Sequence, residues 1–517
     1  MRERPLVAID VTPILPGSEN GGAKGFVLAL LEGFIQRGRH RYVLLTTPAN
    51  HNSFAALERT GMTRLCVVDG VVPKAPRKRF LEWLRSRPRK GFGRGPLGGR
   101  GVDLLFCPMT DPAYAEPGVP IVCTVYDLQH LEYPSFFTTA ERAARDAFFS
   151  RVKRAANLVV CISEFTRREV IERLGLGPER VRTIRIAIQS RLVLPSDQAV
   201  LETRARLGIG DAPYAFYPAN GWPHKNHRLL LVGFAHLIGE RPDLPLHLVL
   251  AGNLLEFARE LQLAITQMGL AKRVHLVGFV SDEDLAALWR SAYCLLLPSL
   301  YEGFGIPLLE AMQFGTPIVC SRLASLSEVA GDAAAYIDPR RPAEIGTALK
   351  ELFDNPAVRS ALIERGGKRL EIFQTSDMVN RYLDVLDEVL SGGGHSLAAS
   401  VEGVFNDRLV GPVVTAEAGA SPGGRVWDFE MHLPSELPHP SATVRADLNG
   451  RKVQKLTLQR GQTSRLQVNV PPAGGHLRLE VTPSFVPQAH GDHRELTVQL
   501  VRCQLRESKT GEIVHEV

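Results

Sequence analysis

The run Glu302-Gly-Phe-Gly-Ile-Pro-Leu-Leu-Glu310-Ala-Met decides the fold of this 517-residue chain. It follows the apolar run Tyr293–Pro298, which has the continuous hydrophobic character of a strand buried on both faces of a parallel sheet. Pro307 suits the first turn of a helix. The run therefore predicts a strand, a glycine-rich loop and a helix in succession.

The start of that helix predicts an anion-binding site. The Gly303-Phe304-Gly305 turn lets a ligand approach the backbone closely, and the first amides of the helix suit a diphosphate. Glu310, about one turn into the helix, can accept hydrogen bonds from a ribose diol. Glu302 precedes the glycines, toward the sugar end of such a ligand. The alternative is a plain Gly-Pro helix entry with two surface glutamates.

Strand-like runs alternate with helical patterns on both sides of this motif. The expected strands are Val7–Pro13, Tyr42–Thr47, Leu65–Asp69, Val102–Pro108, Ile121–Asp127, Leu158–Ser163 and Val181–Ile188, then Tyr214–Ala219, Leu246–Gly252, Val274–Phe279, Tyr293–Pro298, Pro317–Ser321 and Ala334–Asp338. Two such series predict two doubly wound, Rossmann-like α/β domains facing a cleft. We expect residues 1–195 to form the first domain and 196–375 the second, with 192–211 linking them.

The remainder of the chain changes character. A helix over Ser376–Leu390 and the glycines that follow it predict a C-terminal helix and flexible linker over 376–394. Beyond it, short alternating runs separated by Pro and Gly predict an all-β sandwich over 395–517.

Composition leaves the class of partner open. The net charge of +6 fits nucleotides, phosphates or a membrane surface. The seven cysteines form no C-x-x-C pair, so we expect reduced thiols and no metal site. The N-terminus lacks a signal-peptide core and no stretch of about 18 apolar residues occurs. We therefore expect a cytoplasmic protein, with any contact to the inner face of the plasma membrane being peripheral.

A second motif, Ala219-Asn-Gly-Trp-Pro-His-Lys225-Asn-His227, follows the first strand of the second domain. Ligand sites in open α/β sheets lie at such strand ends. Lys225 can neutralise a diphosphate leaving group, as Mg²⁺ does in other enzymes. The alternative is a solvated lysine in a turn.

Two further motifs follow strands of the first domain. Gly21-Gly22 opens a helix and can hold a phosphate or a sugar, although a simple turn explains it equally well. Asp127 and His130, in Thr-Val-Tyr-Asp127-Leu-Gln-His130, lie where catalytic residues collect. Asp127 is a candidate base or orienting group and His130 a candidate acceptor or donor contact. A helix N-cap is the alternative for Asp127.

The segment 74–100 carries ten basic residues and one acidic residue, with aromatic side chains interleaved. Such a stretch can lie on anionic lipid. A polyanionic acceptor and a surface loop with solvated arginines are the alternatives. No nucleic-acid recognition module is readable, so we expect no nucleic-acid partner.

Together these motifs resemble the family-4 retaining glycosyltransferases of GT-B fold, over about residues 5–392. The likeness is closest over 274–339, and the two glutamates with seven residues between them are the hallmark of that family. The resemblance implies that Glu302 contacts the donor sugar, Glu310 the ribose, Lys225 the diphosphate, the backbone near Phe279-Val280 the base, and the Gly21-Gly22 loop the phosphates and sugar. It also implies a metal-independent reaction without a cofactor, on a nucleotide-diphosphate sugar.

The chain departs from the family pattern at two positions. Many relatives have Arg or Thr where this chain has Asn220, so His224 is expected to supply part of the phosphate contact. Many have His where this chain has Tyr126, which leaves the general base open between Asp127 and His130. By resemblance to such variants, a GDP-linked mannose donor is favoured over a UDP-linked sugar.

The resemblance further implies a glycan or lipid-linked acceptor and a role in cell-surface polysaccharide synthesis. Two alternatives remain: a GT-B phosphorylase or synthase acting on soluble sugars, and a non-catalytic carbohydrate-binding scaffold. The segment after residue 395 resembles β-sandwich appendages of some bacterial glycosyltransferases, most clearly at Asp492–Val498.

Overall fold

The computed structural model describes residues 4–16, 21–67, 97, 100–116, 118–188, 191–254, 257–392, 399–404, 410–418, 424–433, 440–472, 474–482, 499–508, 510 and 513–516. The basic segment 74–100 lies outside this description except for Leu97 and Arg100, and so does the run Asp492–Val498.

The first domain is built on a seven-stranded parallel sheet in the order β3-β2-β1-β4-β5-β6-β7. Its strands are β1 (Leu6–Asp10), β2 (Arg41–Thr46), β3 (Thr63–Cys66), β4 (Leu104–Cys107), β5 (Ile121–Val125), β6 (Leu158–Cys161) and β7 (Val181–Thr183). The main helices are α1 (Gly22–Arg37), α5 (Thr139–Ala155) and α6 (Glu164–Leu174), with the short α2 (Ala55–Glu58) and α4 (Gln129–Glu132). The strands β1, β4, β5 and β6 are buried almost throughout, as their continuous apolar runs predict.

The second domain has a six-stranded parallel sheet in the order β10-β9-β8-β11-β12-β13. Its strands are β8 (Tyr214–Pro218), β9 (His247–Ala251), β10 (Val274–Gly278), β11 (Cys294–Leu297), β12 (Ile318–Ser321) and β13 (Ala334–Ile337). Its helices are α8 (His227–Glu240), α9 (Phe257–Gln267), α10 (Asp282–Ser291), α11 (Ile306–Gln313), α12 (Leu326–Ala330), α13 (Pro342–Asp354) and α14 (Pro356–Leu370). The two doubly wound domains that the sequence predicts are thus confirmed.

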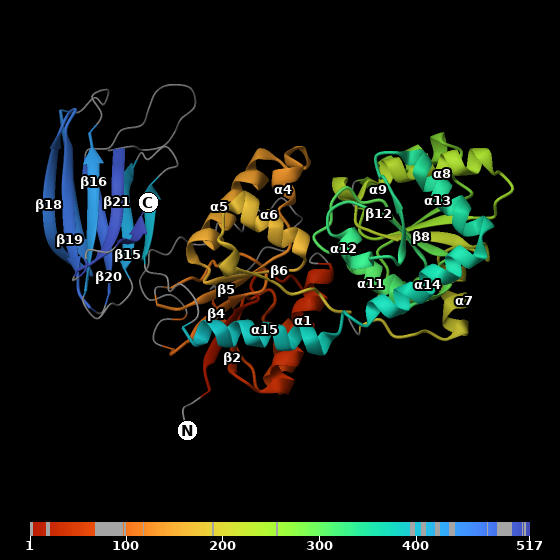
Figure 1. The fold of residues 1–517 in the computed structure, drawn as a ribbon, viewed down its shortest axis with the longest axis horizontal. Coiled ribbons are helices and arrows are strands. Elements are labelled where there is room, and N and C mark those ends of the chain that lie inside the picture. Colours follow the sequence, from red (N-terminus) through yellow and green to blue (C-terminus); the bar gives the residue numbers. More distant parts are fainter. Residues whose placement is uncertain are drawn as a thin grey trace.

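The C-terminal region is all-β, as predicted. It contains β14 (Ala399–Val404), β15 (Val410–Ala418), β16 (Arg425–His432), β17 (Ser441–Leu448), β18 (Arg451–Gln459), β19 (Thr463–Val470), β20 (Gly475–Thr482), β21 (Gln499–Glu507) and β22 (Ile513–Glu516). They form two antiparallel sheets that share one apolar core around Trp427 and Phe429. Figure 1 shows this region beside the first domain, on the side away from the second.

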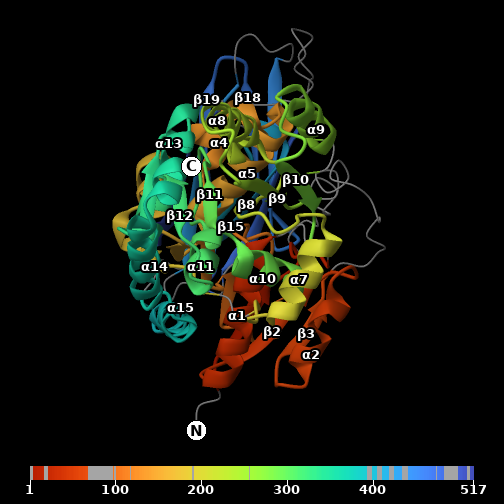
Figure 2. The same ribbon diagram turned by 90° about the vertical axis from the view of Figure 1, so that its right-hand side faces the viewer.

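The linker between the α/β domains contains a helix that the sequence analysis did not predict. Helix α7 (Asp197–Arg206) begins at Ser196, whose side chain accepts a hydrogen bond from the Ala199 amide. It packs beside α10, as Figure 2 shows. Its low amphipathicity and exposed Leu201 explain why no apolar stripe marked it in the sequence.

Helix α15 (Thr375–Leu390) follows the second domain in sequence but packs on the first, beside α1 (Figure 1). Arg39 donates to Asp384 at 2.7 Å, and His40 lies 2.7 Å from Asp387. Gly33 of α1 meets Val379 so closely that an added Cβ would lie 2.4 Å from a Val379 methyl group. The chain thus crosses between the domains twice.

Replacing Gly33 by Ala is expected to destabilise the protein by about 1–3 kcal/mol, because the stiff Val379 side chain has to move and α15 with it. Gly367, exposed in α14 with open space around its Cα, is the matched control, and Gly367→Ala is expected to stabilise by about 0.5–1 kcal/mol. Urea unfolding followed by tryptophan fluorescence checks both. A Gly33→Ala midpoint equal to that of Gly367→Ala would contradict the packing account.

All seven cysteines are free thiols, and every one except Cys66 is buried. In the described part of the chain, no helix is both long enough and apolar enough to cross a bilayer.

Candidate functional site

The predicted site residues gather where the sheet order reverses. In the second sheet β8 and β11 are neighbours at the switch between β9 and β12, and the Lys225 and Glu302 loops follow these two strands. In the first sheet the corresponding strands are β1, which leads to Gly21-Gly22, and β4. Asp127 follows the next strand, β5. Such switch points are where open α/β sheets bind ligands.

Lys225 and Glu302 are in direct contact, with 2.5 Å between the Lys225 Nζ and the Glu302 Oε1. Only 16% of the lysine side chain and 10% of the glutamate side chain are exposed. Ser299 donates a second hydrogen bond to the same Glu302 oxygen at 2.7 Å. A partly buried ammonium group therefore lies beside a carboxylate whose position is fixed from two sides.

The backbone around Lys225 is fixed by Asn226. This residue has a left-handed conformation (φ 62°), which asparagine tolerates better than most residues. Its amide group donates to the Pro298 carbonyl at 3.1 Å and the Pro339 carbonyl at 2.9 Å. Tyr217 donates to the Lys225 carbonyl at 2.5 Å. The lysine loop is thus tied to the end of β11, from which the Glu302 loop begins.

Helix α11 begins at Ile306 after Gly305, whose φ of 99° requires glycine. Its N-cap residue is glycine, so the helix has no N-cap side chain, and Pro307 occupies the first turn. The start of α1 in the other domain touches this point, since a Cβ on Gly22 would lie 2.3 Å from the Ile306 Cδ1. The predicted glycine-rich loop and the predicted anion site are thus adjacent.

Glu310 is almost fully buried one turn into α11. Its carboxylate accepts hydrogen bonds from Arg191 at 2.6 Å and from the Trp289 indole at 3.2 Å. Burial raises the pKa of Glu310, while the Arg191 guanidinium opposes that rise. A surface glutamate, the alternative considered for this position, does not fit this environment.

The other residues that the sequence predicts for donor binding lie around the same loops. Asn220 accepts a hydrogen bond from the Asn253 amide at 2.8 Å, so its side chain fastens two loops together. Burial, together with the nearby Lys225 charge, lowers the pKa of His224 well below its usual range, which keeps the imidazole neutral at pH 7. Phe279 is 65% exposed and Val280 packs partly on the core.

Phe304 differs from its neighbours in the loop. Its ring is buried edge-on against Phe373, with 5.9 Å between the ring centres. The side chain therefore belongs to the core, and any ligand contact at this position would be made by the backbone.

Asp127 and His130 are placed differently from each other. Asp127 accepts a hydrogen bond from the Gln129 amide at 3.0 Å, a turn contact two residues along the chain, and lies 3.5 Å from the Arg145 guanidinium. His130 is buried and stacks on Phe149 at 5.2 Å, and burial lowers the pKa of its imidazole. Their catalytic roles stay predictions, and the surroundings of His130 are those of a packed core residue.

Contact between the two domains, and not only the approach of a ligand, explains the glycine at position 303. A Cβ at this position would lie 2.0 Å from the Tyr126 carbonyl oxygen of the first domain. Glycine is therefore required there because the two domains approach each other.

Sequence reasoning missed four residues of the site: Arg191, Asn226, Ser299 and Arg145. The contacts of Arg191 and Asn226 join positions far apart in the sequence, whereas Arg145 is closer to Asp127 and Ser299 is three residues from Glu302. The position of Ser299 at the end of an expected strand was the one usable signal.

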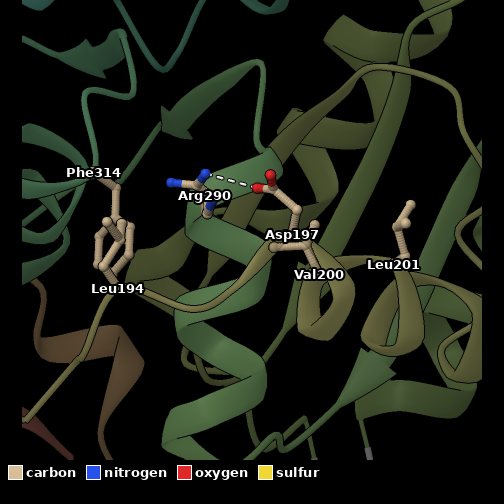
Figure 3. Close-up of a pocket in the computed structure, with 6 residues that line it drawn as sticks. All are labelled: Leu194, Asp197, Val200, Leu201, Arg290 and Phe314. Atoms are coloured by element: carbon tan, nitrogen blue, oxygen red, sulfur yellow. Dashed lines mark hydrogen bonds and ion pairs between the residues drawn. The ribbon is translucent and has the colours of Figure 1, made fainter.

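The structure also has a cavity that lies apart from these contacts. A surface cavity of about 460 Å³ lies beside α7, where Arg290 pairs with Asp197 at 2.7 Å (Figure 3). It is lined by Leu194, Asp197, Val200, Leu201, Arg290 and Phe314, none of which was predicted as a site residue.

Among the residues that the structure describes, no cluster of three or more His, Cys, Asp or Glu is arranged to hold a metal ion.

Both α/β domains match family models of glycosyltransferases. Residues 20–189 match the model of Glycosyltransferase Family 4, and residues 200–369 match that of Glycosyl transferases group 1. The chain is 27% identical over 266 residues to an O-antigen chain mannosyltransferase B of Escherichia coli, covering 50% of this chain and 69% of the relative.

It is also 31% identical over 245 residues to an MMP alpha-(1->4)-mannosyltransferase of Mycolicibacterium hassiacum, covering 47% of this chain and 56% of that relative. Among solved structures, a sucrose-phosphate synthase from Thermosynechococcus elongatus superposes with a TM-score of 0.61 at 18% identity, over 75% of this chain and 100% of that one. At that identity the likeness concerns the fold. The chain belongs to the family-4 glycosyltransferases and is an enzyme of GT-B fold.

Proposed function

We propose that the protein transfers a hexose, with mannose the first candidate, from a nucleotide-diphosphate donor to a glycan or lipid-linked acceptor in the assembly of a cell-surface polysaccharide. The observation that carries the proposal is the Lys225–Glu302 pair just before α11, the helix that also holds the buried Glu310. The two relatives named above are mannosyltransferases, and one acts on an O-antigen chain by its name.

The donor would lie along the start of α11. The first amides of the helix and the Lys225 ammonium group suit the diphosphate, and Glu310 suits the ribose hydroxyls. Glu302, already paired with Lys225, would contact the sugar. Phe279, exposed after β10, suits contact with the base.

The chemistry would proceed with retention and without a metal ion. The bond between the anomeric carbon and the diphosphate oxygen breaks, and the acceptor oxygen bonds to the same face of that carbon. The acceptor proton passes to the leaving phosphate. Lys225 would stabilise the negative charge that builds on this phosphate in the transition state. Asp127 remains the candidate for orienting the acceptor hydroxyl.

A transfer assay tests the proposal. The protein is incubated with EDTA, a panel of GDP- and UDP-linked sugars and short glycan or lipid-linked acceptors, and nucleotide release and product are measured. Acceptor-dependent release of one nucleotide, with a product of retained anomeric configuration, is expected. Binding of a nucleotide without any transfer would instead favour the carbohydrate-binding scaffold.

The affinity for the donor is expected to fall as the pH drops. Burial raises the pKa of Glu310, so its ionised form, which accepts the ribose hydroxyls, is lost at a pH above the ordinary glutamate value of about 4.3. Because Arg191 opposes this rise, Arg191→Gln should move the fall in affinity to higher pH. Calorimetric titration of the nucleoside diphosphate between about pH 5 and 8 measures the shift. Identical pH profiles for both proteins would contradict the role given to Arg191.

A further inference from the structure

The Gly303 carbonyl, next to Glu302, is held by the opposite domain. Ser163, at the start of α6, donates to it at 2.8 Å, and Thr166 lies within 3.4 Å of it. The Tyr126 carbonyl of the first domain packs against the Gly303 Cα, where no side chain fits. The loop that carries Glu302 therefore rests directly on the first domain.

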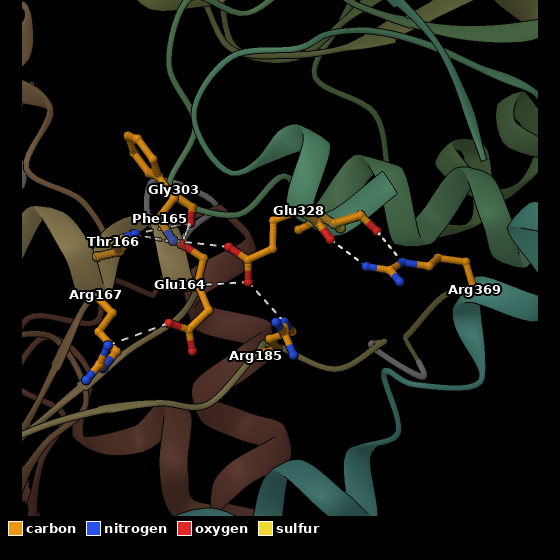
Figure 4. A network of polar contacts seen from close by, with 10 residues as sticks. Glu164, Phe165, Thr166, Arg167, Arg185, Gly303, Glu328 and Arg369 are labelled. Atoms are coloured by element: carbon orange, nitrogen blue, oxygen red, sulfur yellow. Dashed lines mark hydrogen bonds and ion pairs between the residues drawn. The ribbon is translucent and has the colours of Figure 1, made fainter. Parts of the chain in front are cut away.

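Helix α12 of the second domain reaches the same place through Glu328. Its carboxylate accepts hydrogen bonds from the amides of Glu164 at 3.0 Å and Phe165 at 3.1 Å (Figure 4). These are among the first amides of α6, which lack partners within their own helix. Arg185, also of the first domain, donates to the same carboxylate at 3.0 Å. A residue of one domain thus caps a helix of the other.

Helix α12 is also joined to the loop that carries Glu302. Ser325, directly before α12, donates to the Glu302 carbonyl at 2.8 Å. The consecutive carbonyls of Glu302 and Gly303 are therefore held by Ser325 from their own domain and by Ser163 from the other. Arg369 donates to the Glu328 carbonyl at 2.5 Å and fastens the base of α12 to α14 (Figure 4).

We propose that Ser163 and Glu328 are positioning residues that make the placement of Glu302 depend on the closed arrangement of the two domains. The inference rests on the proposed function, because it assigns a consequence to Glu302 in transfer. Neither residue needs to touch the donor. When the domains separate, the Gly303 carbonyl loses its contacts with Ser163 and Thr166, and the Glu302 loop is held from one side only. Transfer would then occur only while both domains enclose the substrates.

Steady-state kinetics of Ser163→Ala and Glu328→Gln test this proposal. Each is expected to lower kcat by about ten- to a hundredfold, as small misplacements at reacting centres do, while the dissociation constant for the nucleoside diphosphate changes less than about threefold. Ser163→Thr, which keeps the hydroxyl, should restore most of kcat. Thr138→Ala is the matched control, because it removes the N-cap of α5 without touching the second domain.

A kcat that is unchanged in Ser163→Ala, or lowered equally in Thr138→Ala, would overturn the proposal.

A second measurement does not depend on turnover. Small-angle scattering of Ser163→Ala/Glu328→Gln should give a larger radius of gyration than wild type and Thr138→Ala. If wild type transfers no sugar from any donor, the proposed function fails while scattering still tests the contact between domains. An unchanged radius would show that these residues do not hold the domains together.

Discussion

Glu302→Gln is expected to lower kcat by about a hundred- to a thousandfold, the range seen when one preorganised electrostatic partner is removed from a reacting centre. The carboxylate lies 2.5 Å from the Lys225 ammonium group and 2.7 Å from the Ser299 hydroxyl, so its position is fixed before the substrates bind. Glutamine keeps the shape and removes the charge. In the proposed reaction, loss of that charge would remove a carboxylate that stabilises the positive charge developing on the sugar.

Single-turnover kinetics with saturating donor measure this effect. Glu260→Gln is the control, because Glu260 pairs with Arg228 on the outside of the same domain and removal of that carboxylate should leave kcat unchanged. Melting temperatures of both variants show whether the protein remains folded. A Glu302→Gln enzyme with kcat within about threefold of wild type would remove Glu302 from the chemistry.

Glu310→Ala is expected to weaken binding of the nucleoside diphosphate by about a hundredfold, or roughly 3 kcal/mol. Hydrogen bonds to a charged group contribute about 1.5–3 kcal/mol each, and a ribose diol offers two donors to one carboxylate. Glu310→Gln keeps one carbonyl acceptor. Its affinity for the nucleoside diphosphate should therefore lie between the affinities of wild type and Glu310→Ala. The side chain is buried, so part of the loss in Glu310→Ala reflects Arg191 and Trp289 left without their partner.

A thermodynamic cycle separates the two contributions. The 2′-deoxy form of the same nucleoside diphosphate lacks one ribose hydroxyl, so wild type should bind it more weakly than the ribonucleotide. Glu310→Ala should bind the two forms equally, because the group that distinguishes them is gone. Equal discrimination by variant and wild type, in calorimetric titration, would show that Glu310 does not hold the ribose.

Patterns that are local in sequence predicted much of the fold. Thirteen parallel strands were predicted, most of them from continuous apolar runs. The Glu302 loop was likewise predicted from the sequence, because glycines, a proline and two carboxylates follow one strand. Strand ends were predicted less well. The strand expected to run to Ile188 stops at Thr183, because β6 pairs with β7 over only three residues.

Contacts between distant segments were not predictable. Arg191, just before the interdomain linker, reaches Glu310, and Glu328 caps α6 from the other domain. Neither has a pattern of its own, since an arginine in a loop and a glutamate in a short helix occur on any surface. Gly303 was assigned to ligand approach, whereas its neighbour is the Tyr126 carbonyl of the first domain. Only the packing of the two domains reveals that reason.

The central claim is that the start of α11, Lys225 and Glu310 bind a nucleotide-diphosphate donor without a metal ion. Thermal unfolding of the wild-type protein with a panel of nucleoside diphosphates and nucleotide sugars, in EDTA, tests it most directly, because a ligand of the folded state raises the melting temperature by mass action. We predict that one nucleotide raises it by several degrees in EDTA and that Lys225→Ala abolishes the rise. Folded protein that no nucleotide stabilises would contradict the account.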